Sequence, residues 1–268
     1  MNILVTINNK YINHLKTLIK SIQKSNPDEL FNIYLFHKDL SKKDINNIKL
    51  SLTKKMHLIP IKIKNKEIDN YPVYVERYPT EIYLRIFASI YLPKDIDRIL
   101  YLDTDIIVIN KLNKLYNMNF NDNYYIASTN IGKFIHIFNE VRLGLNKKHP
   151  YINTGVLLIN LKKLRSIEIE YEVNNFVKKK RKVLMLPDQD IISTLYGSKI
   201  KVIDNLIYNL SDRTLNLHNF KNYNSKIDLN WIRKNTIIIH YYGKNKPWKK
   251  NYKGILNCFY DEILEEVE

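Results

Sequence analysis

The stretch R-I-L-Y-L-D-T-D-I-I-V-I-N, residues Arg98 to Asn110, decides the fold and raises the first question about function. Most of its residues suit a buried strand, and Asp103 and Asp105 interrupt the apolar run. A strand that is apolar on both faces is typical of the centre of a sheet that helices cover. The stretch therefore predicts a central strand of an α/β protein that carries two carboxylates.

The first hundred residues alternate between short apolar runs and segments with helical spacing. Further strands are expected at 2–7, 31–36 and 56–63, and helices at 11–24, 41–52 and 80–91. This alternation indicates βαβ units with a mostly parallel sheet. The chain has only six glycines and no G-x-G-x-x-G loop, so a bound diphosphate must be neutralised by other means.

The residues after 110 are less regular. Strands are expected at 124–128, 155–160, 201–203 and 236–240, and helices at 133–143, 161–165, 172–181 and 188–196. No repeat, long linker or low-complexity segment divides the chain, which favours one large domain.

Composition places the chain among globular proteins, with 45% hydrophobic and 12% aromatic residues. Cys258 is the single cysteine, so an internal disulfide is excluded. No apolar run approaches the roughly 20 residues of a membrane helix, and the first ten residues do not form a secretory signal. A cytoplasmic protein is the expectation.

The formal net charge of +16 raises the question of nucleic-acid binding. The 43 basic residues comprise 35 Lys and only 8 Arg, which indicates a general compositional bias, and no nucleic-acid partner is expected. The basic run Lys178–Lys182 is most simply a solvated helix end. The charge does favour attraction to anionic partners such as phosphorylated sugars or an acidic membrane surface.

Asp103 and Asp105 lie two residues apart, so on a strand their side chains share one face. Two unpaired carboxylates there would cost several kcal/mol in lost hydration and repulsion. A divalent cation reverses that cost, and carboxylate oxygens suit Mg²⁺ or Mn²⁺. The alternative is a turn at the end of a strand with two solvated aspartates, and the tripeptide alone does not separate the two.

The segment I-I-I-H-Y-Y-G-K-N-K-P-W, residues 237–248, ends a predicted strand with a metal-binding side chain. His240 stands at the tip of the apolar run, although a lone histidine is usually an ordinary polar residue. Gly243 permits close approach of the backbone, and Lys246 supplies a point charge suited to phosphate. The three within seven residues predict a site for a metal and a diphosphate.

Two further segments begin with polar residues. N-T-G-V-L-L-I-N-L, residues 153–161, places Asn153 and Gly155 directly before an apolar strand. L-P-D-Q-D, residues 186–190, places three polar side chains at a helix N-terminus, where helix capping alone would explain them.

In this order, together with Tyr11 and Arg85, the motifs resemble glycosyltransferase family eight, which includes glycogenin and bacterial lipopolysaccharide galactosyl- and glucosyltransferases. The similarity runs from Met1 to about Lys250. It implies a GT-A fold, a single α/β domain over 1–268 with a mixed central sheet. Its parts would be a Rossmann-like nucleotide-binding half (1–110), a sugar and acceptor half (111–253) and a C-terminal helix or tail (254–268).

The resemblance also implies an activity. Such enzymes move a hexose, with glucose or galactose favoured here, from a UDP-sugar to a saccharide, glycolipid or protein-linked glycan. They retain the anomeric configuration and use Mn²⁺, with Mg²⁺ as an alternative. By this resemblance the metal ligands are Asp103, Asp105 and His240; the diphosphate residues are Gly243 and Lys246; the uridine residues are Thr6, Asn8 and Tyr11; and the other donor-binding residues are Arg85, Thr104, Asn153, Gly155, Asp188 and Gln189.

Retention requires either a double displacement or attack on the face from which UDP departs. Asp188, Gln189 and Asp190 are the catalytic candidates, and the resemblance places Gln189 near the anomeric carbon. An amide oxygen is a poor nucleophile, and Asp190 is chemically better but not placed by the sequence. We favour same-face attack, with Asp188 and Gln189 positioning the sugar.

Two positions depart from the family pattern. The family often has an acidic residue where Asn8 stands, which weakens the basis for base selectivity. Lipopolysaccharide-type relatives often end in a basic, aromatic tail, whereas this chain ends D-E-I-L-E-E-V-E. Peripheral contact with the inner face of a membrane would therefore use the cluster at Lys244–Lys253.

Two other classes of protein remain as alternatives. A haloacid-dehalogenase-like phosphatase also uses D-x-D, with Asp103 as nucleophile and Asp105 beside it. That motif usually follows the first strand and turns at once, whereas here it lies on the fourth strand and continues as I-I-V-I. A basic nucleic-acid-binding module would leave both aspartates without a role.

Overall fold

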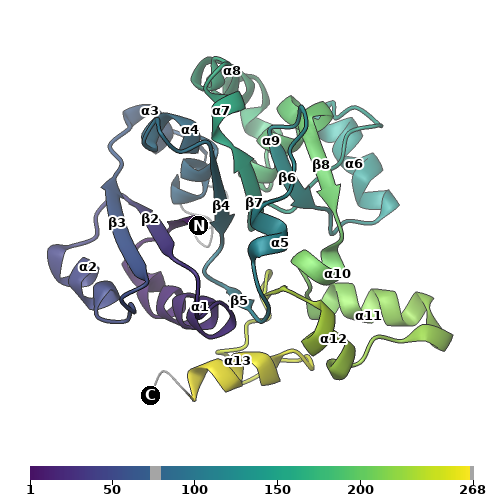
Figure 1. Ribbon diagram of the computed structural model, residues 1–268. Helices are drawn as coiled ribbons and strands as arrows, with labels where there is room; N and C mark the ends of the chain where they lie inside the picture. Colours follow the sequence, from purple (N-terminus) through teal and green to yellow (C-terminus); the bar gives the residue numbers. More distant parts are fainter. Residues whose placement is uncertain (73–79, 266–268) are drawn as a thin grey trace.

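The computed structural model describes residues 1–72 and 80–265, which fold around a seven-stranded sheet (Figure 1). The last three residues of the predicted segment 254–268 lie outside the described ranges. The strands are β1 Asn2–Thr6, β2 Phe31–His37, β3 Met56–Lys62, β4 Arg98–Leu102, β5 Ile106–Val108, β6 Tyr125–Ser128, β7 Val156–Asn160, β8 Ile200–Ile203 and β9 Ile238–His240.

The large sheet has the order β3-β2-β1-β4-β7-β6-β8, which runs from left to right in Figure 1. β1 to β4 are mutually parallel, β7 is antiparallel to both β4 and β6, and β8 is parallel to β6. The predicted α/β class with a mixed central sheet is confirmed. One sheet joins the strands of residues 1–110 to those that follow.

Helices cover the sheet, and further helices surround the small β5–β9 sheet at the bottom of Figure 1. They are α1 Ile12–Ser25, α2 Lys42–Lys49, α3 Lys66–Asp69, α4 Ala88–Tyr91, α5 Asn113–Tyr116, α6 Lys133–Leu143, α7 Leu161–Leu164, α8 Ile169–Lys180, α9 Pro187–Tyr196, α10 Asn205–Tyr208, α11 Asp212–Lys221, α12 Leu229–Asn235 and α13 Asn257–Leu264. The 3-10 turns are η1 Asn9–Tyr11, η2 Thr80–Arg85, η3 Arg181–Val183, η4 Gly197–Lys199 and η5 Tyr223–Ser225. Within the described residues, every helix falls short of the length and apolarity that crossing a bilayer requires.

Local sequence signals set several of these elements. The apolar spacing of α1 buries Ile12, Leu15 and Ile22 against the sheet, as predicted. Ser41 and Asp44 form a capping box that begins α2, also as predicted.

The prediction of a continuous strand over 98–110 is wrong. β4 ends at Leu102, the chain turns through the two aspartates, and β5 pairs with β9 in the separate small sheet. The two side-chain carboxylates need polar partners that the dry interior of a sheet does not offer, so the strand ends just before the first of them. The alternative of a turn at the end of a strand is correct about the backbone.

The predicted helix over 80–91 is also wrong in form. It is the 3-10 turn η2 followed by the four-residue α4. Residues 83–89 are all buried, so this segment is surrounded by protein, whereas a surface helix would expose one face.

Candidate active site

Hydrogen bonds fix the turn of the two aspartates between the large and the small sheet. The backbone N–H of Asp103 donates to the carbonyl oxygen of Gly155 at 2.8 Å, which extends the pairing of β4 with β7. The backbone N–H of Tyr241 donates to the carbonyl oxygen of Asp105 at 2.9 Å, which extends the pairing of β5 with β9. Both carboxylates are therefore held at the edge where the two sheets meet.

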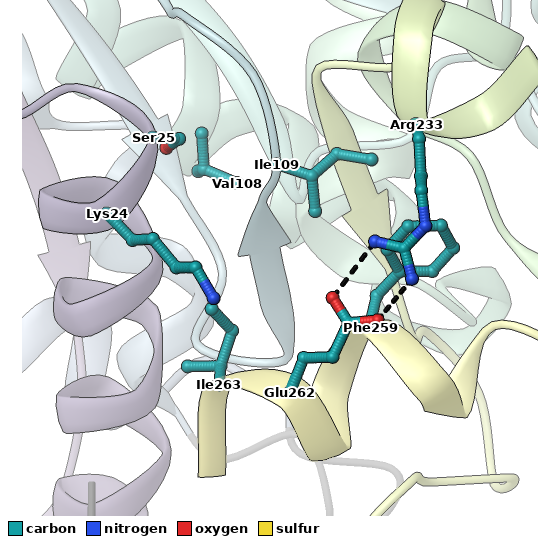
Figure 2. A pocket seen from close by; sticks show the side chains of 8 residues that line it. All are labelled: Lys24, Ser25, Val108, Ile109, Arg233, Phe259, Glu262 and Ile263. Carbon is teal, nitrogen blue, oxygen red and sulfur yellow. Dashed lines mark hydrogen bonds and ion pairs between the residues drawn. The ribbon is translucent and has the colours of Figure 1, made fainter. Parts of the chain in front are cut away.

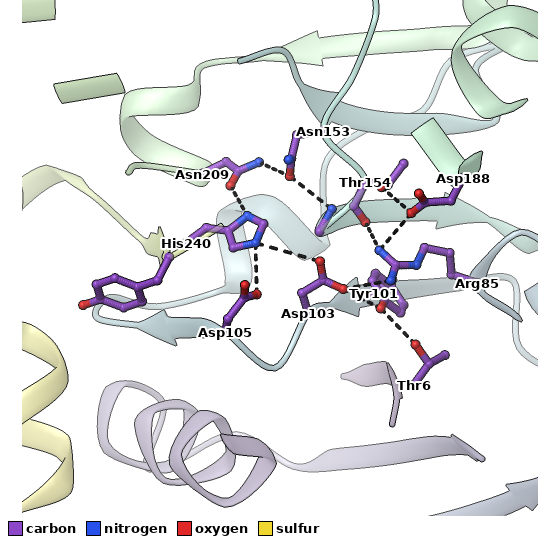
Figure 3. A network of polar contacts seen from close by, with 12 residues as sticks. Thr6, Arg85, Tyr101, Asp103, Asp105, Asn153, Thr154, Asp188, Asn209 and His240 are labelled. Atoms are coloured by element: carbon purple, nitrogen blue, oxygen red, sulfur yellow. Dashed lines mark hydrogen bonds and ion pairs between the residues drawn. The ribbon is translucent and has the colours of Figure 1, made fainter. Parts of the chain in front are cut away.

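His240 is the last residue of β9 and is only 1% exposed, and its ring faces both aspartates (Figure 3). Its Nε2 lies 3.8 Å from Oδ2 of Asp103 and 3.1 Å from Oδ1 of Asp105. One ligand atom from each residue lies within 4.8 Å of the others. The structure thus brings together the three residues that the sequence predicts as metal ligands.

Asn209 determines which nitrogen of His240 faces the aspartates. The Asn209 amide group donates to Oγ of Ser128 at 2.8 Å and to Oδ1 of Asn153 at 3.0 Å, so its carbonyl oxygen faces Nδ1 of His240 at 2.8 Å. Nδ1 therefore carries a proton, and Nε2 is the ring nitrogen that faces the two carboxylates. Nε2 is buried and has no hydrogen-bond partner, which is the state of a nitrogen prepared for a metal ion.

The chemistry of the donor set fits a divalent cation. Two carboxylates and one imidazole nitrogen suit Mn²⁺ or Mg²⁺, and a bound ion would give the buried Nε2 of His240 a partner. The charged side chains around the site are Asp103, Asp105 and Asp188 against Arg85 and Lys246, which leaves one negative charge. Arg85 and Lys246 already offset part of the repulsion between the carboxylates, whereas from the sequence we expected a metal ion alone to provide that compensation.

Arg85 connects the metal-ligand cluster to α9. Its guanidinium is almost fully buried and forms ion pairs with Asp103 at 3.0 Å and with Asp188 at 3.2 Å. The guanidinium also lies over the Tyr101 ring, 4.2 Å from its centroid, and donates to the carbonyl oxygen of Thr154 at 3.1 Å. Figure 3 shows Arg85 between the two carboxylates, so it fixes both of their positions.

The ionisation of two carboxylates follows from these contacts. Burial tends to raise the pKa of Asp105, but the His240 ring and the Lys246 ammonium outweigh it and hold that pKa well below its ordinary value. Burial raises the pKa of Asp188, which Arg85 and the Thr154 hydroxyl only partly oppose. Asp105 therefore stays ionised at neutral pH, as a metal ligand must.

Two positions at this site require glycine, one because space is short and one because of its backbone conformation. A Cβ on Gly155 would lie 2.2 Å from Cε1 of His240 and 2.8 Å from Oδ2 of Asp103, so a side chain there would collide with both. Gly243 has a φ of +91°, which other residues rarely adopt.

We expect Gly155→Ala to lower affinity for Mn²⁺ by at least about tenfold, because the His240 ring and the Asp103 carboxylate would have to move apart. Isothermal titration calorimetry measures this affinity. Gly132→Ala is the matched control, since a Cβ at that residue meets nothing within 4 Å. Equal loss in both variants would contradict the prediction.

A second prediction concerns the histidine's support. Asn209→Ala should weaken Mn²⁺ binding by about 10- to 100-fold, because Nδ1 of His240 loses the acceptor that fixes its proton. Asn222→Ala is the control, since that amide approaches the ring of half-buried His218, which is not part of the cluster. Unchanged affinity of the Asn209 variant by the same calorimetry would show that Asn209 has only a packing role.

The remaining predicted residues lie at different distances from this centre. Lys246 forms an ion pair with Asp105 and donates to the carbonyl oxygen of Tyr241 at 2.8 Å. Thr6 ends β1 and contacts the Tyr101 hydroxyl at 3.1 Å, which in turn donates to Asp103 at 2.6 Å. The structure thus joins Lys246 and Thr6 to the cluster.

The other members of the predicted donor site follow at its margin. Asn8 caps η1 by accepting from the backbone of Lys10, and Tyr11 ends that turn. Thr104 lies half-buried between the two aspartates, and Gln189 is half-buried in the first turn of α9. No hydrogen bond or ion pair in the described structure joins the side chains of Asn8, Thr104 or Gln189 to the metal-ligand residues.

Asp190 is not brought into the cluster. It is fully buried and accepts two hydrogen bonds from Arg142, each at 2.8 Å, and one from the Tyr151 hydroxyl at 2.7 Å. The backbone N–H groups of Met185 and Leu186 also donate to it. Residues two apart on a helix point about 200° apart, so Asp190 faces away from the side of α9 that carries Asp188 to Arg85.

Sequence reasoning missed Asn209, Tyr101 and Thr154. Tyr101 stands two residues before Asp103, so strand alternation could have placed both on one face. Thr154 lies inside the N-T-G motif and donates to Asp188 at 2.6 Å. Asn209 lies in an otherwise apolar segment, and no local pattern distinguishes it, because its role depends on contacts with distant residues.

A separate cavity of about 280 Å³ lies between α1, β5, α12 and α13 (Figure 2). Arg233 and Glu262 form an ion pair at its margin, and Lys24, Val108 and Phe259 are among its lining residues. It shares no residue with the cluster around Asp103.

Comparison with known proteins identifies the family. Residues 2–252 match the profile described as glycosyl transferase family 8. The chain belongs to glycosyltransferase family 8. It is 29% identical over 98% of its length to a Haemophilus influenzae protein that is a glycosyltransferase by assignment only, of which it covers 77%. It is 27% identical to an Escherichia coli lipopolysaccharide 1,2-glucosyltransferase, over 86% of this chain and 68% of that one.

The fold of this family 8 member matches that of solved glycosyltransferases. The crystal structure of galactosyltransferase LgtC with donor and acceptor sugar analogues superposes with a TM-score of 0.83, covering 99% of this chain and 96% of that one at 23% identity. The predicted GT-A fold is therefore confirmed. The family match also favours a sugar transferase over the phosphatase and the nucleic-acid-binding module.

Proposed function

We propose that this family 8 glycosyltransferase transfers a hexose, glucose or galactose, from a UDP-sugar to a saccharide or glycolipid acceptor, with Mn²⁺ and with retention of configuration. The observation that carries the proposal is the buried Nε2 of His240, which faces Asp103 and Asp105 but makes no hydrogen bond within the described residues. The lipopolysaccharide glucosyltransferase of Escherichia coli among the relatives supports a hexose and a glycolipid.

Different residues would bind the metal ion, the diphosphate and the uridine of the donor. Asp103, Asp105 and His240 would hold Mn²⁺, which when bound neutralises charge on the departing diphosphate. Lys246 adds a second positive charge on the same side, and the backbone at Gly243 can approach the phosphates closely. Thr6, Asn8 and Tyr11 would receive the uridine, with the Tyr11 ring available for stacking.

The sugar would lie against Arg85, Asn153, Gly155, Asp188 and Gln189. Arg85 holds Asp188 in place, and Asp188 in turn is fixed by the Thr154 hydroxyl, so its carboxylate can orient sugar hydroxyls. Gln189 follows it in the first turn of α9 and would position the donor near the anomeric carbon.

The surroundings of Asp190 favour same-face attack. A nucleophilic carboxylate needs a free oxygen directed at the anomeric carbon, whereas both oxygens of Asp190 are taken by Arg142, Tyr151 and two backbone N–H groups. In the proposed step the acceptor oxygen forms a bond to the anomeric carbon while the bond between that carbon and the phosphate oxygen of UDP breaks. The electron pair leaves with the phosphate oxygen, which also receives the acceptor proton.

Thermal denaturation and UDP release with a panel of UDP-sugars test this function. At 100-fold excess over its dissociation constant, the correct donor with Mn²⁺ should stabilise the fold by about 2.7 kcal/mol and raise Tm by roughly 5–10 °C. UDP-glucose or UDP-galactose should also show slow UDP release. Equal stabilisation by ADP-sugars, or none by any UDP-sugar with Mn²⁺, would refute the proposal.

A further inference from the structure

Helix α6 presents an apolar stripe to solvent. Phe134 is 90% exposed and Val141 is 84% exposed, and Ile137 and Phe138 are about half exposed between them. Positions 134, 137, 138 and 141 follow the spacing of a single helical face. We name these four residues the α6 stripe.

Apart from buried Leu143 at its last residue, the inward face of α6 is polar, unlike that of an ordinary surface helix. His136 contacts Glu140 at 2.8 Å and the carbonyl oxygen of His149 at 2.8 Å. Buried Asn139 accepts from Arg142 at 2.7 Å, and Arg142 forms the ion pair with Asp190. These bonds hold α6 with the α6 stripe outward, so the exposure of the stripe is set by the fold.

A strongly basic segment adjoins the α6 stripe. Arg142 donates to the carbonyl oxygen of Val183, directly after the run Lys178–Lys182. The ammonium of Lys180 lies 3.9 Å from the place of a Cβ on Gly144, which ends α6. Exposed Met185 follows the run.

The charge around this surface is one-sided. Residues 133–150 and 178–186 contain nine Lys and Arg residues and a single acid, Glu140. Lys147, Lys148, Lys178, Lys179, Arg181 and Lys182 are exposed. An exposed apolar stripe flanked by lysines is complementary to a bilayer whose headgroups are anionic and whose interior is apolar.

We propose that the α6 stripe and the basic run Lys178–Lys182 dock this protein on an anionic lipid bilayer. Phe134, Phe138 and Val141 enter the interfacial region, and the lysines contact lipid phosphates. A basic partner-binding groove for an acidic protein would need no outward Phe134 and Val141, so a bilayer accounts for more of the surface.

The sequence alone pointed to Lys244–Lys253 for membrane contact. In the structure both aromatic residues of that cluster are directed to the protein: Trp248 stacks on His14 with ring centroids 3.9 Å apart, and the Tyr252 hydroxyl donates to Asp212. Lys246 is occupied by Asp105. The α6 surface therefore combines exposed apolar and basic side chains more fully.

The position of α6 relates docking to the site. The helix begins five residues after Ser128, which contacts Asn209 and through it His240. A bilayer bound at α6 would thus lie beside the acceptor half of the site, a consequence that rests on the proposed function. The docking itself does not depend on it.

Co-sedimentation of the full chain with vesicles tests the docking. Binding should be strong with phosphatidylcholine vesicles that contain phosphatidylglycerol, weak with phosphatidylcholine alone, and reduced by salt. Phe134→Ser/Val141→Ser should lower affinity by about tenfold or more. Compared with wild type, Lys178→Glu/Lys179→Glu should lower the affinity for these vesicles by about 100-fold, because it reverses two charges.

Matched controls come from the end of α2 and the turn that follows it, at the opposite edge of the sheet beside β3 (Figure 1). Leu50→Ser replaces an 87% exposed apolar residue, and Lys49→Glu/Lys54→Glu reverses two exposed charges, and neither should change vesicle binding. Unchanged binding of either α6-surface variant, equal binding to neutral vesicles, or a dimer that the Phe134→Ser/Val141→Ser variant abolishes would overturn the proposal. UDP release with the donor alone should be unchanged in all variants, which separates a failure of docking from a failure of the proposed function.

Discussion

Asp105→Asn is expected to reduce sugar transfer by at least about 10³-fold and to abolish measurable Mn²⁺ binding, because one charged ligand and the partner of Lys246 are lost together. Asp103→Asn should have a similar effect on transfer, since Asp103 also forms the ion pair with Arg85. Steady-state kinetics at varied Mn²⁺, together with calorimetry, measure both effects.

Asp122→Asn is the matched control, because that side chain is 83% exposed and pairs with Lys163 at the surface. It should leave kcat and Mn²⁺ affinity within about a factor of two of wild type, because an exposed ion pair contributes little free energy. If Asp105→Asn keeps more than a tenth of wild-type transfer, the metal-ligand role of this residue is wrong. Loss of Mn²⁺ binding with transfer intact would show that the metal is not needed.

Asp190→Ala is expected to destabilise the fold by about 3–5 kcal/mol, which corresponds to a fall in Tm of roughly 10 °C. Without the carboxylate, Arg142 is left as a nearly buried charge without its counter-ion. The Tyr151 hydroxyl and two backbone N–H groups also lose their acceptor. Thermal denaturation of the variant, with denaturant titration for the free energy of unfolding, checks this expectation.

Asp122→Ala again supplies the control and should cost less than about 1 kcal/mol, because it removes an exposed ion pair. The gentler Asp190→Asn separates structure from chemistry. We expect the folded Asp190→Asn protein to transfer sugar within about tenfold of the wild-type rate, because a residue that only positions α6 and α9 takes no part in the chemical step. A loss near 10⁴-fold in a stable Asp190→Asn protein would instead favour a covalent route through this carboxylate.

Much of the fold could be read from the sequence because apolar periodicity is a local property. The strands around Ile3, Ile33 and Leu58 and the buried face of α1 occupy nearly their predicted residues. The failures occur where a contact distant in sequence decides the backbone. Residues 83–89 are buried all round, which no periodicity records, and β5 leaves the large sheet because β9 offers it a separate partner.

The candidate site divides in the same way. The sequence determined which residue types could bind a metal, namely the aspartates of D-T-D and the histidine at the tip of an apolar run, and that the lysine after the histidine could bind a diphosphate. Only the tertiary structure decided that Asn209 orients His240, that Arg85 joins Asp103 to Asp188, and that Asp190 turns away to Arg142. Residue chemistry is fixed by each amino acid alone, whereas orientation and pairing arise from side chains that packing brings together across the whole chain.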